Sequence, residues 1–197
     1  IIAERGVRYG RVVMDGADVI RIVEWADTNE VERAIGLCNA GVLCAPAAAF
    51  VGWLRAVTPS PKGEYYLTDC VALARADGVR VAAVEAPAEE LRGVNSRAEL
   101  AEAEATVQGW LRTAAMAGGA TLTAPDTVML SADTVLAPDT VVGPHVVFGP
   151  GVRVETGAEI KAFSHLEGAH VGEGAVIGPY ARLRPGTVVE ADAHVGN

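Results

Sequence analysis

The sequence predicts an α/β segment, then one long connecting helix, then a β-helix built from hexapeptide repeats. Three observations support this fold class. Candidate strands and helices alternate through the first half, a capped helical run follows, and a six-residue repeat fills the last third of the chain.

In the α/β segment, residues 11–24 predict a β-hairpin, because two apolar runs flank Asp15-Gly16, a favoured tight-turn pair. Thr28 can cap a short acidic helix through Ala34, and residues 41–44 form a candidate buried strand.

Pro46 suits the first turn of a helix that we expect to run to about Val57. A second helix is predicted at 69–77, with Thr68 as its cap and Gly78 just beyond its end, and residues 79–84 form a further candidate strand.

The connecting helix is predicted to begin at the capping box Ser96-Arg97-Ala98-Glu99 and to end at Gly118-Gly119. Its expected apolar face carries Leu100, Ala103, Val107, Leu111 and Ala114. We therefore expect three parts, at residues 1–95, 96–119 and 120–197.

The repeat places an aliphatic or aromatic residue at every sixth position, with one five-residue step. These residues are Leu130, Leu136, Val142, Phe148, Val154, Ile160, Leu166, Val171, Ile177, Leu183, Val189 and Val195. A small or β-branched residue follows most of them four positions later, and Gly-Pro pairs fall in several intervening turns. Each repeat therefore supplies one inward side chain and one corner of a triangular coil, so the pattern predicts a β-helix from near Thr121.

The composition limits the partners of the chain. A net charge of −9 argues against a non-specific nucleic-acid or anionic-membrane surface, which would need clustered Lys and Arg. The apolar stretch 40–54 is too short to span a bilayer. Cys38, Cys44 and Cys70 have no metal-ligand spacing, and we interpret them as free, buried thiols in a reducing cytosol.

The chain opens on Ile1 and stops at Asn197 inside a hexapeptide, with no capping sequence after Val195. This pattern predicts an internal fragment of a longer protein.

Four polar or glycine positions in the α/β segment are candidate functional residues. Gly10 precedes the hairpin, Glu24 ends its second strand, Asn39 enters an apolar run, and Asn95 adjoins a helix start. Taken singly, each has an ordinary structural explanation: a turn glycine, a solvated carboxylate, an amide capping local backbone, or a neighbour of a helix cap.

The order of these positions resembles the sugar-1-phosphate nucleotidyltransferases. The motifs are Tyr9-Gly10-Arg11, Ile22-Val23-Glu24, Asn39-Ala40-Gly41, Gly63-Glu64-Tyr65-Tyr66-Leu67-Thr68-Asp69 and Gly93-Val94-Asn95-Ser96-Arg97. With the β-helix and the run Ala181-Arg182-Leu183-Arg184-Pro185-Gly186, essentially the whole chain resembles one family. That family is the bifunctional N-acetylglucosamine-1-phosphate uridylyltransferase / glucosamine-1-phosphate acetyltransferase of bacteria.

The resemblance implies the C-terminal half of a Rossmann-like nucleotidyltransferase domain followed by a left-handed parallel β-helix. It implies a cytoplasmic homotrimer that uses UTP, acetyl-CoA and Mg²⁺ to supply UDP-N-acetylglucosamine for cell-envelope polysaccharides. By resemblance, Gly10, Glu24 and Asn39 hold the sugar, and Asn95 binds Mg²⁺ and the nucleotide sugar. Arg184 binds the sugar phosphate of the acetyl-transfer reaction, for which its planar fork of donors is suited.

The chain departs from the family pattern at Arg8, where Gly is usual, and at Trp25-Ala26, where a more polar pair is usual. The family's phosphate loop, its second metal ligand and its catalytic His and Lys fall outside the chain. No catalytic residue is therefore assigned within it, and we expect it to show no meaningful transferase activity alone. His145, His165, His170 and His194 are expected to be surface or inter-chain residues.

Two alternatives stay open at the level of sequence. One is a single-function sugar-1-phosphate nucleotidyltransferase with a β-helix tail. The other is a non-catalytic, trimer-forming β-helix module.

Overall fold

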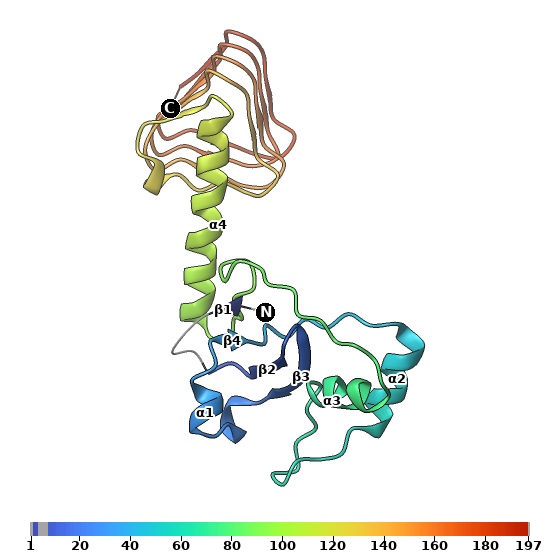
Figure 1. Ribbon diagram of the computed structural model, residues 1–197. Coiled ribbons are helices and arrows are strands. Elements are labelled where there is room, and N and C mark those ends of the chain that lie inside the picture. Colours follow the sequence, from blue (N-terminus) through green and yellow to red (C-terminus); the bar gives the residue numbers. More distant parts are fainter. Residues whose placement is uncertain (1, 4–7, 197) are drawn as a thin grey trace. The chain divides into compact units, whose positions relative to one another are not determined.

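The computed structural model describes residues 2–3 and 8–196, shown in Figure 1. The chain divides into two compact units, Ile1–Asn95 and Ser96–Asn197.

The first unit is built on a four-stranded sheet whose described pairings are antiparallel. The strands are β1 (Ile2–Ala3), β2 (Arg11–Asp15), β3 (Asp18–Val23) and β4 (Leu37–Cys38), in the order β1-β4-β2-β3. The predicted hairpin is confirmed, because Asp15 pairs with Asp18 across a turn in which Gly16 has φ +57°. A glycine accepts this left-handed conformation without steric cost.

Helices complete the α/β unit. They are η1 (Trp25–Asp27), α1 (Glu30–Arg33), α2 (Ala47–Ala56) and α3 (Asp69–Ala76). α3 packs against β3 and α2, and both predicted longer helices are confirmed. Val71 of α3 joins a core with Val12, Val19 and Ile22, while Trp53, Cys70 and Ala74 form a second apolar cluster.

Several predicted local details are wrong. The cap of α1 is Asn29 rather than Thr28, because Asn29 and Glu32 form a reciprocal capping box. Residues 41–44 are not a strand, since Gly41 has φ +78° and its N–H donates to the Asn39 side chain (3.1 Å), which makes a local turn. Of the predicted strand 79–84, one isolated bridge between Ala82 and Asp18 is present. Cys44 is exposed, whereas the sequence predicted a buried thiol.

The second unit begins with α4 (Arg97–Ala117), whose predicted N-terminus is confirmed by the Ser96 hydroxyl accepting from the Glu99 N–H (3.2 Å). The predicted apolar face is partly wrong, because Leu100 and Val107 are exposed. The apolar residues of the helix that pack on the solenoid core are Leu111 and Ala115, in its C-terminal part.

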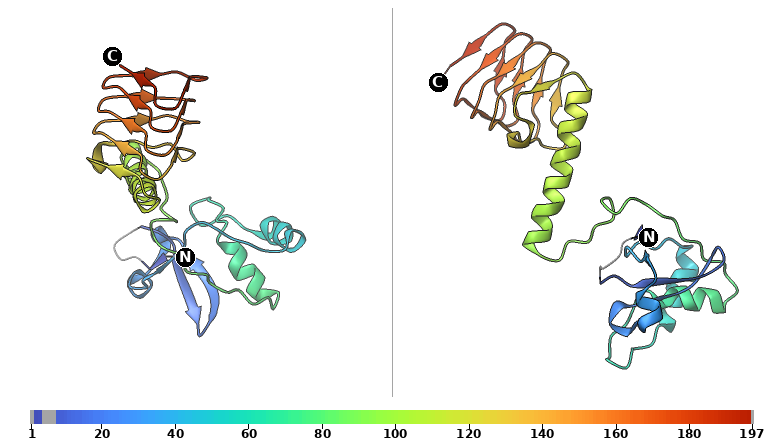
Figure 2. Two further views of the ribbon diagram at one scale, coloured as in Figure 1. Left: turned by 90° about the horizontal axis from the view of Figure 1, so that it is seen from above. Right: turned by 60° about the vertical axis from the view of Figure 1, so that its left-hand side comes forward.

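The remainder of this unit is a parallel solenoid, whose stacked coils are visible in Figure 2. Its elements are β5 (Thr121–Leu122), η2 (Pro125–Thr127), β6 (Val135–Leu136), β7 (Val141–Val142), β8 (Val147–Phe148), β9 (Arg153–Val154), β10 (Glu159–Ile160), β11 (His165–Leu166), β12 (His170–Val171), β13 (Val176–Ile177), β14 (Arg182–Leu183), β15 (Val188–Val189) and β16 (His194–Val195). The strands of this unit form three parallel sheets, ordered β16-β13-β10-β7-β5, β14-β11-β8 and β15-β12-β9-β6.

The hexapeptide prediction is confirmed at the level of individual side chains. Val142, Val154, Ile160, Leu166 and Ile177 are completely buried inside the coils. The small corner positions are buried too, among them Thr140, Ala158 and Ala175. One inward residue per repeat therefore forms the continuous core of the solenoid. Among the helices of the described residues, none combines the length and apolarity that crossing a bilayer requires.

Candidate functional site

Glu24 lies directly after β3, at the point where the chain leaves the sheet for η1. It lines a cavity of about 200 Å³ together with Arg21, Asp27, Tyr66, Thr68 and Asp69, among others. The Thr68 hydroxyl donates a hydrogen bond to Glu24 Oε1 (2.8 Å), which fixes the orientation of the carboxylate. Thr68 is buried and precedes α3, where the sequence predicted a helix cap; its side chain makes no capping bond there.

Gly10 links the sugar-site residues predicted from the sequence. It precedes β2, is buried, and its carbonyl oxygen accepts a hydrogen bond from the Asn39 N–H (2.8 Å). A Cβ on Gly10 would lie 3.2 Å from Ile22 Cγ2 and 3.6 Å from Glu24 Oε2. A side chain at position 10 would therefore press on the end of β3, beside the Glu24 carboxylate.

Asn39 follows β4 and lines a second, largely apolar cavity of about 390 Å³. Its Oδ1 caps the N–H of Gly41, so the amide already serves the local turn. Ile22 lines both this cavity and the Glu24 cavity, so the two lie next to each other in the first unit.

Asn95 is exposed at the end of the first unit. A Cβ on Gly93 would lie 3.8 Å from the Tyr9 hydroxyl and 4.0 Å from Asn95 Nδ2, so the 93–95 segment lies beside Tyr9. The structure thus brings Gly10, Glu24 and Asn39 together, and it places Asn95 next to the residue that precedes Gly10.

Within residues 2–3 and 8–196, the donor set for a divalent metal is incomplete. Among the described residues there is no group of three or more His, Cys, Asp or Glu side chains arranged to hold an ion. Asn95 offers a single amide oxygen, whereas Mg²⁺ takes six oxygen ligands. The residues present therefore do not by themselves fit a magnesium site.

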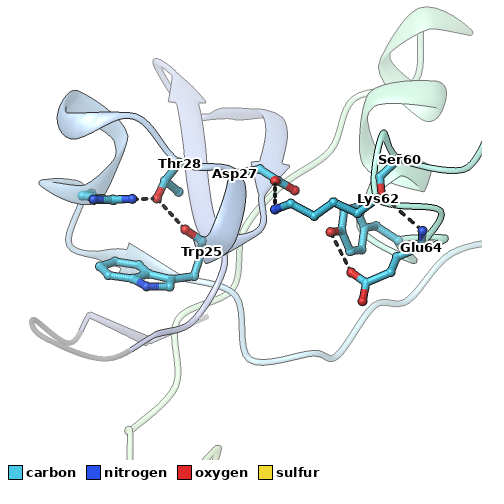
Figure 3. A network of polar contacts seen from close by, with 8 residues as sticks. Trp25, Asp27, Thr28, Ser60, Lys62 and Glu64 are labelled. Carbon is cyan, nitrogen blue, oxygen red and sulfur yellow. Dashed lines mark hydrogen bonds and ion pairs between the residues drawn. The ribbon is translucent and has the colours of Figure 1, made fainter.

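A polar network joins η1 to a loop distant in sequence (Figure 3). Lys62 Nζ donates to Asp27 Oδ1 (2.7 Å), and the Tyr66 hydroxyl donates to Glu64 Oε2 (2.9 Å). The hydrogen bond from Lys62 lowers the pKa of Asp27, and the same bond raises the pKa of Lys62. The hydrogen bond to Glu64 raises the pKa of Tyr66. No pattern within the sequence pairs positions 27 and 62.

Trp25, one of the departures from the family pattern, lies within this region. The guanidinium groups of Arg11 and Arg33 lie over its ring, 4.7 and 5.5 Å from the centroid. Arg33 Nε also donates to the Thr28 hydroxyl (3.2 Å), which in turn donates to the Trp25 carbonyl (2.8 Å). Trp25 is therefore held by cation–π contacts next to Glu24.

Arg184 lies in the second unit, in the turn between β14 and β15. It is exposed, and its carbonyl accepts from the Thr187 N–H (3.0 Å). Arg184 is therefore an exposed residue in a turn that its own backbone helps to hold.

The four histidines of the solenoid are all exposed, as predicted. His145 stacks on Phe163, which stacks on Tyr180, with ring centroids 4.9 and 5.1 Å apart. His170 Nε2 lies 3.0 Å from Glu155 Oε1.

Comparisons with known proteins agree with the resemblance drawn from the motifs. No protein-family model matches the chain. Proteins named bifunctional protein GlmU from Gluconacetobacter diazotrophicus, Acidiphilium cryptum and Ruegeria sp. are 69%, 62% and 54% identical to it. Each alignment covers 96% of this chain, but 41%, 44% and 42% of the respective relative. The chain thus spans about two fifths of the length of these curated relatives.

Proposed function

We propose that the chain belongs to the family of bifunctional GlmU proteins and forms part of an enzyme that makes UDP-N-acetylglucosamine. The enzyme would acetylate glucosamine-1-phosphate from acetyl-CoA and then transfer a uridylyl group from UTP to the product. The observation that carries the proposal is the gathering of Gly10, Glu24 and Asn39 at one end of the sheet, in the motif order of the family. A cytoplasmic location stays a prediction.

For uridylyl transfer, the sugar phosphate attacks the α-phosphate of UTP and expels pyrophosphate. We assign Gly10, Glu24 and Asn39 to holding the sugar. A carboxylate suits this role because it accepts several hydrogen bonds from sugar hydroxyls, and Thr68 occupies one lone pair while orienting the group. Such a reaction depends mainly on positioning and charge neutralisation, so a fixed sugar is a direct contribution to the rate.

We keep Asn95 as a proposed ligand of Mg²⁺ and of the nucleotide sugar. When bound, Mg²⁺ would neutralise the developing charge on the phosphates. Because one amide oxygen does not make a magnesium site, no step is routed through the ion, and Asn95 would act with ligands from outside the described residues.

For acetyl transfer, Arg184 would bind the phosphate of glucosamine-1-phosphate. An exposed guanidinium can form two parallel hydrogen bonds to a phosphate. The solenoid would assemble as a trimer, as the resemblance implies. Light scattering on the chain should then give a trimer mass, and a monomer mass at high concentration would contradict this part of the proposal.

The sugar site can be tested by titrating the ¹⁵N-labelled chain with UDP-N-acetylglucosamine in NMR. Amide resonances of Gly10, Glu24 and Asn39 should shift, and Glu24→Gln should weaken binding about five- to ten-fold, because it replaces a charge-assisted hydrogen bond with a neutral one. Glu89→Gln removes an exposed carboxylate of the same unit and should leave binding unchanged. Saturating ligand that leaves these three amides unmoved would contradict the site assignment.

A further inference from the structure

The walls of the Glu24 cavity come from two segments far apart in sequence. One wall is formed by Arg21, Glu24 and Asp27, at the end of β3 and in η1. The other contains Tyr66 and Thr68, from the end of the connection between α2 and α3, and Asp69, the first residue of α3. Any motion between these segments changes access to the cavity.

The 58–66 loop, defined as residues 58–66, has its own internal bonding. The Ser60 N–H donates to the Glu64 carbonyl (2.8 Å), the Gly63 N–H donates to the Ser60 carbonyl (2.8 Å), and the Glu64 N–H donates to the Ser60 hydroxyl (3.2 Å). Gly63 has φ +83°, which permits the tight turn. Most of the loop is exposed, so it forms a self-contained turn with little buried area to hold it down.

An ion pair attaches the tip of this loop to the opposite wall. Lys62 Nζ lies 2.7 Å from Asp27 Oδ1, and the two side chains are 55% and 38% exposed. The pKa shifts of Asp27 and Lys62 run in the directions expected for a formed pair. Because both partners are solvent-accessible, the pair is weak and is screened by salt.

We propose that Asp27 and Lys62 form a releasable latch that holds the 58–66 loop against η1 beside the Glu24 cavity. The pair is placed where it can act, since Asp27 lines the cavity and Lys62 comes from the loop that leads into Tyr66. Opening the latch frees the loop, and closing it ties the two walls together. Its role in admitting a sugar phosphate rests on the proposed function, whereas the latch itself does not.

Hydrogen exchange of the loop amides tests the latch without any ligand. The Ser60, Gly63 and Glu64 amides are the reporters, because each makes one of the internal bonds of the loop. At low salt, Lys62→Gln and Asp27→Asn should each raise their exchange rates about two- to five-fold, the effect expected of an exposed ion pair. The double variant should match the single variants, because either substitution alone already removes the pair.

Salt and a matched control complete the design. Raising NaCl from about 0.02 to 0.5 M should bring the parent chain close to the variant rates and leave the variants nearly unchanged. Arg80→Gln removes another exposed ion pair of the same unit, with Asp18, and should not affect the loop. Equal loop exchange in the parent chain and Lys62→Gln, or additive effects in the double variant, would overturn the latch. A failure of sugar binding would leave this result intact, so the two proposals fail separately.

Discussion

Gln108 provides the strongest test of how α4 and the solenoid are joined. It is the one α4 residue that is fully buried, at 4% exposure, although a helix face chosen by hydrophobic period misses it. Its Nε2 donates to the Leu130 carbonyl (2.7 Å), and its Oε1 accepts from the Leu130 N–H (2.9 Å). The Gln108 amide thus makes the two hydrogen bonds to the Leu130 backbone that a neighbouring strand would otherwise make.

We expect Gln108→Met to destabilise the second unit by about 2–4 kcal/mol. The side chain keeps a similar volume, but both Leu130 backbone groups lose their partner, at about 1–2 kcal/mol each for a buried unsatisfied group. Gln108→Glu should cost at least as much at neutral pH, because a carboxylate would face the Leu130 carbonyl and the Glu104 carboxylate that Nε2 now contacts (2.9 Å). At low pH the introduced Glu would be protonated and would again donate to the Leu130 carbonyl. The loss of stability relative to the parent chain should then be smaller.

Urea denaturation and hydrogen exchange at the Leu130 amide measure the effect. Thr106→Ala, which removes an exposed hydroxyl on the same helix, is the control and should change stability by less than about 0.5 kcal/mol. If Gln108→Met also changes stability by less than about 0.5 kcal/mol and leaves hydrogen exchange at the Leu130 amide unchanged, the reasoning is refuted.

Three further predictions concern the core, the site and an ion pair. Ile160→Ala should destabilise the solenoid by about 2–5 kcal/mol in urea denaturation, because it empties a fully buried position, and a loss below 1 kcal/mol would contradict the observed packing. Thr68→Val keeps the side-chain shape but removes the donor to Glu24, so NMR titration should show UDP-N-acetylglucosamine binding weakened several-fold; unchanged affinity would show that Thr68 does not position the carboxylate. The hydrogen bond from Arg80 lowers the pKa of Asp18 below its ordinary value of 3.8. The stability that this bond contributes is therefore present at pH values above 3.8 and is lost as the pH falls through the folded pKa of Asp18. Arg80→Ala should therefore raise the pKa of Asp18 in a carboxyl NMR titration, and an unshifted curve would count against the pair.

The solenoid was predictable because its information is local and repeated. Each inward residue, such as Val154 or Ile160, meets the same environment one coil later, so period and burial agree. The hairpin at Asp15-Gly16 was predictable for a similar reason, since the turn residues determine its geometry.

The errors occur where a distant partner decides the outcome. Gln108 reads as a polar surface residue until the Leu130 backbone is placed beside it. Thr68 has the sequence context of a helix cap, but its hydroxyl serves Glu24, 44 positions away. The sequence predicted a short strand at 41–44, but the strand lies at Leu37–Cys38, because β4 pairs there with β1 and β2. Local helix and strand propensities contain no information about these contacts with distant residues.

In the candidate site, too, some features were predictable from the sequence and others depend on distant partners. The motifs predicted Gly10, Glu24 and Asn39 as one group, and the fold brings them together. The Lys62–Asp27 pair and the Arg contacts on Trp25 required the structure, because their partners lie on different elements.

The most direct test of the account is a chimera. The matching segment of the Gluconacetobacter diazotrophicus relative, 69% identical, would be replaced by this chain, and both reactions would be assayed by pyrophosphate release and by free-thiol release from acetyl-CoA. We expect both activities to persist, with Glu24→Ala abolishing mainly uridylyl transfer and Arg184→Ala mainly acetyl transfer. A chimera that folds but has neither activity, or in which both substitutions affect the same reaction, would contradict the assignment of two sites to this chain.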